Sequence, residues 1–177
     1  MSNFVINPYV SGCEEVAWMS TLAFTPTNTL TLTADYNARG EGGTTNSAMI
    51  GEVLTTVKCN IADAEAGSAL DGTIYCEVRR LSDNNLQHSL DDMPASELDG
   101  TKTEYTFTGT NYTIQDGDTI CIRYPNASAT KQMILYRSDG VSAYDGTNSG
   151  RSYYTVASDT WGVENSEDWL AIFLACT

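Results

Sequence analysis

Basic residues are scarce in this sequence, where nine Lys and Arg stand against twenty-three Asp and Glu for a formal net charge of −14. A phosphate backbone would be repelled by such a chain, so nucleic acid is not an expected partner. Long apolar runs are missing too, which argues against a membrane-spanning helix and a membrane partner. Residues 1–12 have no basic leader and only a short apolar run, so no signal peptide is recognisable.

Histidine is almost absent, since His88 is the only one, and it sits among loop-forming residues. Neither a histidine-activated nucleophile nor a zinc site is expected from one such residue, and no phosphate-binding glycine motif occurs. We therefore expect no enzymatic activity. A glycosidase remains the alternative, because it needs only two suitably spaced carboxylates. The candidate carboxylates are Glu77, Glu104, Glu164, Glu167 and Asp168.

Closely spaced cysteine pairs, which mark zinc and redox sites, are also missing. The five cysteines are Cys13, Cys59, Cys76, Cys121 and Cys176. Cys59 and Cys76 each alternate with apolar residues in a β-like run, as Cys176 does with its own neighbours, so these three are predicted to face the core. Buried free thiols are the first interpretation, and a Cys59–Cys76 disulfide in an oxidising compartment is the second.

The chain does have the alternation of apolar and polar residues that is typical of β-strands. Between residues 103 and 124, two alternating runs flank Asp116-Gly117-Asp118, a pattern typical of antiparallel strands joined as a hairpin, with one buried and one wet face. Similar units recur, threonine is frequent, and no convincing amphipathic helix appears. We predict an all-β, two-sheet antiparallel β-sandwich of the jelly-roll kind, because the Cys-Trp-Cys spacing of an immunoglobulin domain is missing. Residues 1–15 are predicted to be an extended arm, and residues 16–177 a single sandwich domain.

Strands and loops can be placed along the predicted domain. The glycine-rich residues 40–43 are predicted to be a loop. Residues 82–100 are predicted to be a long surface loop with at most one short helical turn after Pro94. The predicted strands lie near residues 16–25, 29–34, 52–61, 73–81, 105–108, 119–124, 132–136, 153–156 and 169–175.

The order of motifs resembles a known group of sandwiches. A long strand and a small-residue loop lead to Tyr-x-Cys-x-Val, then to Pro-Ala-Ser-x-Leu, Tyr-Thr-Phe and Ile-x-Asp-Gly-Asp-Thr-Ile-Cys-Ile-Arg-Tyr, and finally to Gly-x-Ser-Tyr-Tyr and Asp-Trp-Leu-Ala-Ile-Phe. Over residues 51–176 this is similar to the lectin-like or carbohydrate-module-like jelly rolls of microbial surface proteins and viral structural proteins. The resemblance implies a binding or structural module and transfers no ligand residues.

Aromatic side chains gather in the last third of the chain beside polar residues, as a sugar-binding face or a protein interface requires. The alternative is that the tryptophans are core and the tyrosines border the sandwich. The candidate ligand-binding residues are Tyr144, Arg151, Tyr153, Tyr154 and Trp161.

Acidic turn residues offer a possible cofactor site, because Ca²⁺ takes hard oxygen ligands on loops. Asp116 and Asp118 are the candidate ligands, although Asp-Gly is first of all a turn dipeptide and no EF-hand loop occurs. No other cofactor is expected.

From these features we expect a non-enzymatic structural subunit of a repeated surface assembly, either a virion decoration, turret or fibre protein or a filament subunit. Its partners would be copies of itself or other structural proteins, and its location a virion or extracellular surface. Phe4, Val5, Ile6 and Tyr9 of the arm are the candidate subunit contacts, by addition of a strand to a neighbour. The alternative function is a carbohydrate-binding or adhesion module.

Overall fold

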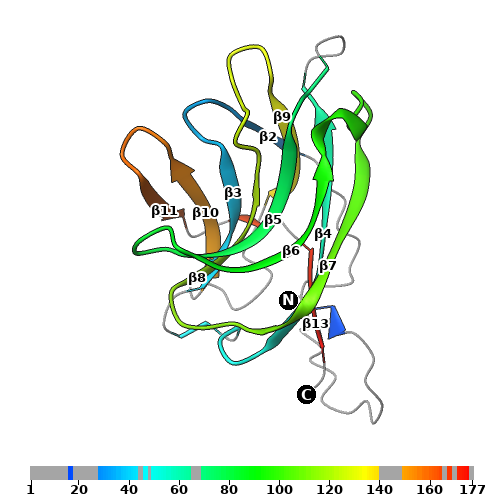
Figure 1. Cartoon of the computed structure of the whole chain (residues 1–177). Coiled ribbons are helices and arrows are strands. Elements are labelled where there is room, and N and C mark those ends of the chain that lie inside the picture. Colours follow the sequence, from blue (N-terminus) through cyan, green and yellow to red (C-terminus); the bar gives the residue numbers. More distant parts are fainter. Residues whose placement is uncertain are drawn as a thin grey trace.

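Strands make up nearly all of the regular structure in the computed structural model of the chain. The structure describes residues 16–17, 28–43, 46–47, 49–64, 69–139, 149–164, 167–168 and 171–175, so the predicted arm lies outside the described residues. Within these residues the sole helical element is the single 3₁₀ turn Ala95–Glu97. The strands form two antiparallel sheets that pack against each other (Figure 1), which confirms the predicted all-β sandwich.

Among the described residues, seven strands form sheet A and six form sheet B. Sheet A contains β1 (Val16–Ala17), β2 (Asn28–Leu32), β4 (Val53–Asp63), β7 (Thr103–Thr113), β9 (Met133–Asp139), β12 (Glu167–Asp168) and β13 (Ala171–Ala175). Sheet B contains β3 (Ala38–Gly43), β5 (Thr73–Arg80), β6 (Leu86–Pro94), β8 (Asp118–Arg123), β10 (Ser149–Thr155) and β11 (Thr160–Glu164).

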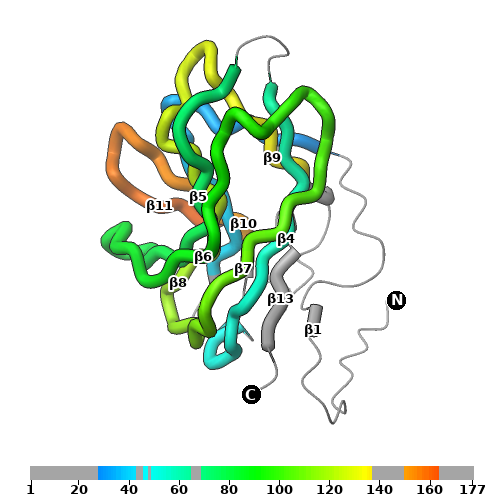
Figure 2. The backbone as a smooth tube through the Cα atoms, turned by 45° about the vertical axis from the view of Figure 1, so that its right-hand side comes forward, coloured from blue at the N-terminus to red at the C-terminus, as the bar shows by residue number. Residues whose placement is uncertain are grey.

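Nested pairing of eight strands defines the fold. β5 pairs with β6, β4 with β7, β3 with β8 and β2 with β9, so the chain from β2 to β9 is one long hairpin. Figure 2 shows β4 beside β7 and β5 beside β6. Two further pairings, β4 with β9 and β5 with β8, roll this hairpin into the sheets β2-β9-β4-β7 and β3-β8-β5-β6. This is the strand arrangement of a jelly roll, as predicted.

Apolar residues from both sheets fill the space between them. Ile74, Cys76 and Val78 alternate along β5 with side chains of the opposite face, and all three are buried. Cys59 of sheet A belongs to the same core cluster. Cys59 and Cys76 are free thiols, as the first interpretation held, and burial raises the pKa of both. Cys176 lies outside the described residues.

The hairpin predicted across Asp116-Gly117-Asp118 is wrong in its pairing. β7 pairs with β4 in sheet A, whereas β8 pairs with β3 and β5 in sheet B. The turn is real, since Gly117 has a φ of +77° and the Asp118 N–H donates to the carbonyl of Gln115. It carries the chain between sheets, because alternation predicts a strand and its faces but not its partner.

Two predicted loops are strands instead. Residues 40–43 belong to β3 in the middle of sheet B, and nine of the nineteen residues 82–100 belong to the edge strand β6. The short helical turn after Pro94 is confirmed as Ala95–Glu97. β6 was not predicted as a strand because many of its residues are polar, and an edge strand tolerates polar residues.

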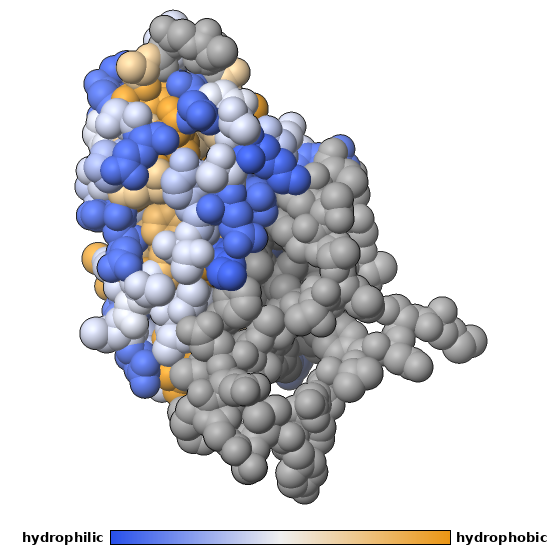
Figure 3. Space-filling model, turned by 90° about the vertical axis from the view of Figure 1, so that its right-hand side faces the viewer, coloured by the Kyte–Doolittle hydropathy of each residue, from blue (hydrophilic) through white to orange (hydrophobic). Residues whose placement is uncertain are grey.

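The outward side of β7 is solvated and rich in threonine. Most side chains of this strand are exposed, and Phe107 is its one fully buried residue. In the space-filling view the described part of the molecule shows mainly hydrophilic and weakly polar side chains, with apolar ones in narrow gaps between them (Figure 3). This is one wet sheet face of the kind that the alternating pattern predicts.

Gly40 allows β3 to approach β8 closely. A Cβ atom built at this position would lie 2.6 Å from the Cα of Cys121 and would contact the carbonyl oxygen of Ile120 still more closely. Both are backbone atoms of β8, so β3 could accommodate an added methyl group only if β8 moved. Gly40 indicated a loop in the sequence, but the close packing of β3 against β8 requires a glycine at this position.

We expect Gly40→Ala to lower the free energy of unfolding by at least about 3 kcal/mol, because the added methyl overpacks against backbone. Gly42→Ala is the matched control on the same face of β3, where a Cβ would meet Leu81 Cδ1 at an ordinary 3.4 Å. Its effect should stay within about 1 kcal/mol. Urea unfolding followed by circular dichroism measures both, and equal effects of the two variants would contradict this account.

Candidate functional site

The β10–β11 hairpin extends sheet B beyond the jelly-roll strand β3. Along β10, Tyr153 lies opposite Arg39 and Arg151 lies opposite Glu41. Directly opposed residues share a face, and the register of β3 with β8 places this face on the side of the core isoleucines of β8. Four residues that are polar or amphipathic therefore continue the inner face of the sandwich sheet.

These residues border a pocket of about 260 Å³ at the end of the sandwich. Its described lining residues are Leu30, Tyr36, Arg39, Arg151 and Tyr153. The rings of Tyr36 and Tyr153 meet edge to face with centroids 6.0 Å apart, and the Arg39 guanidinium carbon lies 4.6 Å and 5.3 Å from these centroids. β2, the β2–β3 turn, β3 and β10 thus each contribute to one aromatic and cationic pocket.

Two arginines from adjacent strands are among the described lining residues of the pocket. Burial lowers the pKa of Arg39 to about 10, and the neighbouring charge of Arg151 acts in the same direction. Electrostatic interactions with Tyr36 and Tyr153 act in the opposite direction. The pocket therefore holds two like charges in a partly desolvated place.

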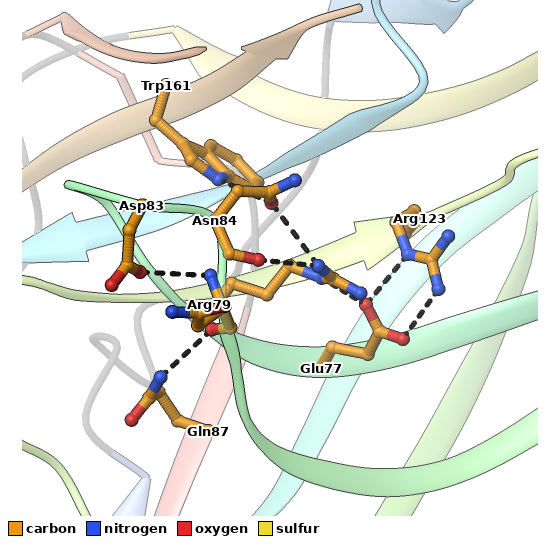
Figure 4. Close-up of polar contacts among 8 residues, drawn as sticks. Glu77, Arg79, Asp83, Asn84, Gln87, Arg123 and Trp161 are labelled. Atoms are coloured by element: carbon orange, nitrogen blue, oxygen red, sulfur yellow. Dashed lines mark hydrogen bonds and ion pairs between the residues drawn. The ribbon is translucent and has the colours of Figure 1, made fainter. Parts of the chain in front are cut away.

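An ionic network covers the opposite face of the same sheet (Figure 4). The Glu77 carboxylate accepts two hydrogen bonds from Arg123, both of 2.8 Å, and one of 2.6 Å from Arg79 Nε. Glu77 is 3% exposed, so this carboxylate is buried under its own partners. The network explains why β8 is buried on both faces rather than wet on one.

Arg79 connects this network to the β10–β11 hairpin. Its guanidinium donates to the main-chain carbonyl of Asn84, at 2.7 Å, and to the side-chain Oδ1 of the same residue. That Oδ1 also accepts the Trp161 indole N–H at 3.0 Å. The β5–β6 turn is thereby held against β11, with Asn84 in the left-handed conformation at a φ of +57°.

Burial and hydrogen bonding oppose each other at Glu77. Burial favours the neutral acid, but the hydrogen bonds and charges of Arg123 and Arg79 together outweigh it, and the pKa of Glu77 lies below its usual value. The same pairing raises the pKa of Arg123. Glu77 is therefore a structural anion at neutral pH.

The predicted ligand-binding residues divide between the two faces. Arg151 and Tyr153 line the pocket, whereas Tyr154 and Trp161 lie on the opposite face with ring centroids 5.5 Å apart. Tyr144 lies outside the described residues. The alternation of β10 could have shown this division, because adjacent residues of a strand point to opposite faces.

Tyr36 and Arg39 complete the pocket and were missed by sequence reasoning. They lie more than one hundred residues before Tyr153, and no local motif links them. The available signal was an Arg and a Glu alternating with three glycines over residues 39–43, which indicates a strand with one polar and one bare face.

The proposed calcium ligands have different surroundings. The Asp118 carboxylate is buried, accepts the Tyr112 hydroxyl at 2.7 Å and pairs with Arg80 at 3.2 Å. The main-chain carbonyl of Asp116 accepts a hydrogen bond from Arg80. Among the described residues, no three His, Cys, Asp or Glu side chains are grouped so that they could hold a metal ion.

Three of the groups considered for catalysis, His88, Glu77 and Glu104, contact side chains other than one another. His88 stacks on Tyr112 with centroids 5.0 Å apart, and Glu104 pairs with Lys58 at 3.7 Å. Glu77 and Glu104 belong to different sheets.

No family model, curated protein or solved structure matches the chain. In the part of the chain that the structure describes, no helix has the length and apolar character needed to cross a membrane.

We expect Glu77→Gln to destabilise the protein by about 3 kcal/mol at pH 7, because it removes the anion that two arginines surround. A carboxyl with a lowered folded-state pKa stabilises fully above its unfolded pKa of 4.5 and loses this effect as pH falls through the folded value. The difference between the variant and the wild type should therefore shrink steadily below pH 4.5. Denaturant unfolding at pH 7, 5, 4 and 3 measures it.

Asp71→Asn is the control for this experiment. Asp71 also pairs with a cation, Lys131, but both side chains are substantially exposed. Its replacement should change stability little at any pH. A Glu77→Gln effect that is small at pH 7, or that grows as the pH is lowered, would contradict the assigned role.

Proposed function

We propose that this chain is a non-enzymatic structural module of a repeated surface assembly, such as a virion decoration, turret or fibre subunit or a filament subunit. In this role it would act on a virion or extracellular surface, bind copies of itself or other structural proteins, and need no cofactor. The nested jelly-roll pairing of β2 to β9 carries the proposal. Viral capsid proteins and lectins use this architecture, so the support for the proposed role comes from the fold.

Charge is a second support for a surface role. A net charge of −14 on 177 residues keeps copies soluble at high local density, and a dense surface layer requires this solubility. Copies with this charge repel each other at low ionic strength, so assembly should strengthen as salt screens the repulsion.

Deletion of residues 1–10 tests the assembly role. If the arm adds a strand to a neighbour, the wild type should form large symmetric particles in 0.5 M NaCl and the deletion variant should remain monomeric. Light scattering after size exclusion and negative-stain electron microscopy provide the readouts. The control replaces Ser2 and Asn3 with alanine, which leaves the apolar arm residues in place. A wild type that stays monomeric across salt and concentration would contradict the assembly role, and assembly by the deletion variant would contradict the arm.

The pocket favours a second candidate function, carbohydrate binding. Two tyrosine rings supply flat apolar surface, and two guanidinium groups supply hydrogen-bond donors beside them. Sugar sites combine these groups, because a sugar ring presents C–H faces and hydroxyl edges together. This function is compatible with assembly, since a surface subunit can also adhere.

A glycan array with neutral and acidic glycans tests this second function. Binding should be lost in Tyr153→Ala, which removes a pocket wall, and retained in Tyr154→Ala, which changes the next residue on the opposite face. An array without hits would count against glycan binding and leave the assembly role untouched. Hits that depend on Tyr154 and Trp161 instead would place the sugar on the other face.

A further inference from the structure

The pocket concentrates positive charge on an acidic protein. Arg39 and Arg151 are the charged residues among its described lining residues, in a chain with a formal charge of −14. They come from adjacent strands at neighbouring register positions, with Glu41 as the directly opposed residue of Arg151. Glu41 is fully buried and belongs to the same face of the sheet as both arginines. Two guanidinium groups thus border the space that a ligand would enter.

Tyrosine rings hold the Arg39 guanidinium in place. It lies over both Tyr36 and Tyr153, whose edge-to-face contact fixes the two rings relative to each other. Arginines stacked on aromatic rings are pre-organised, so less conformational entropy is lost when their N–H groups bind an anion. Such planar groups suit a carboxylate better than a lysine would, because they can donate two parallel hydrogen bonds.

Size and apolar lining restrict the ligand further. The volume of about 260 Å³ lies just below the range of about 300–1,000 Å³ that is usual for small-molecule sites. Leu30 and the two tyrosine rings provide apolar surface, which an inorganic anion would not use. These properties match one ring that carries both C–H faces and a negative charge.

We propose that this pocket binds one carboxylate-bearing sugar ring, with Arg39 and Arg151 holding the carboxylate and the tyrosine rings packing against the sugar. The inference rests on the proposed carbohydrate-binding function and names its ligand class as an acidic sugar. Terminal and internal uronic acid residues of a polysaccharide share this chemistry.

Gly162 is a positioning residue for this site. It lies opposite Tyr153 on β11, and a Cβ atom there would lie 2.5 Å from the tyrosine hydroxyl oxygen. The ring of Tyr153 therefore lies across the bare backbone of β11, an arrangement in which an aromatic side chain covers a cross-strand glycine. Gly162→Ala would displace this ring while leaving every pocket side chain present.

Methyl glucuronide and methyl glucoside form a matched pair of probes, since a carboxylate in one replaces the hydroxymethyl group of the other. Titration of the full chain in 20 mM NaCl, followed by NMR, should give at least tenfold tighter binding of the glucuronide. Arg151→Gln should reduce this preference to less than threefold, because it removes charge and keeps a hydrogen-bonding group. Gly162→Ala should weaken both sugars, and Tyr154→Ala should change neither.

Other outcomes would overturn the proposal in distinguishable ways. Equal binding of the two sugars would contradict the acidic ligand and retain carbohydrate binding. Acetate bound as tightly as the glucuronide would show an anion site without sugar recognition. Absence of binding by all three probes would contradict the site as a whole.

Folding of the variants needs its own control, because Arg151 lies opposite a buried carboxylate. Tyr36→Ala serves this purpose, since Tyr36 lies in a turn and is 37% exposed. It should keep the thermal midpoint near that of the wild type and still weaken glucuronide binding at least fivefold. A well-folded Tyr36→Ala variant with wild-type affinity would overturn the assignment of this pocket. Dependence of binding on the position of the uronic acid in oligoglucuronides would distinguish terminal from internal recognition.

Discussion

A single buried carboxylate on the outward face of sheet B organises the part of the molecule that carries the candidate site. Glu77 pairs with both Arg123 of β8 and Arg79 of β5, and Arg79 in turn holds the β5–β6 turn, which accepts a hydrogen bond from Trp161. The hairpin that forms the pocket on its inner face is thus fastened through its outer face. Because the carboxylate is buried, loss of its charge would leave two cations unpaired beneath that turn, a larger penalty than an exposed ion pair carries. Stability and site geometry therefore depend on the same residues.

The β10–β11 hairpin has two roles, because successive side chains of a strand point to opposite faces of the sheet. Tyr153 and Arg151 point to the pocket, while Tyr154 and Trp161 support the network on the other side. A cluster of aromatic residues in sequence is therefore not a cluster in space. The proposed roles rest on the architecture, and the pocket adds an aromatic and cationic lining that the architecture alone does not imply.

Sequence patterns predicted those features of the sandwich that depend on neighbouring residues, namely the strands and their buried faces. The alternation of Ile74, Cys76 and Val78 was sufficient for a strand and its buried face. The pairing of the strands could not be predicted, since nothing near Asp116-Gly117-Asp118 shows that β7 and β8 belong to different sheets. Residues 40–43 resembled a loop because glycine, which close approach to β8 requires at position 40, is also a turn residue. Arg151 and Tyr153 of the pocket were predicted as ligand-binding residues, whereas Leu30, Tyr36 and Arg39 lie far from them in the sequence.

The nested order of strand pairs also constrains how the chain reaches this structure. β5 and β6 are joined by a short turn, whereas β2 and β9 are separated by a hundred residues, from Leu32 to Met133. The entropy lost on closing a loop grows with the length of chain that is still unstructured, so each inner pair shortens the loop that the next pair must close. The least costly route starts at the β5–β6 turn and proceeds outward, and the β10–β11 hairpin can dock only after β3 has joined the sheet. A nascent chain would therefore have to leave the ribosome as far as Tyr153 before its pocket could exist.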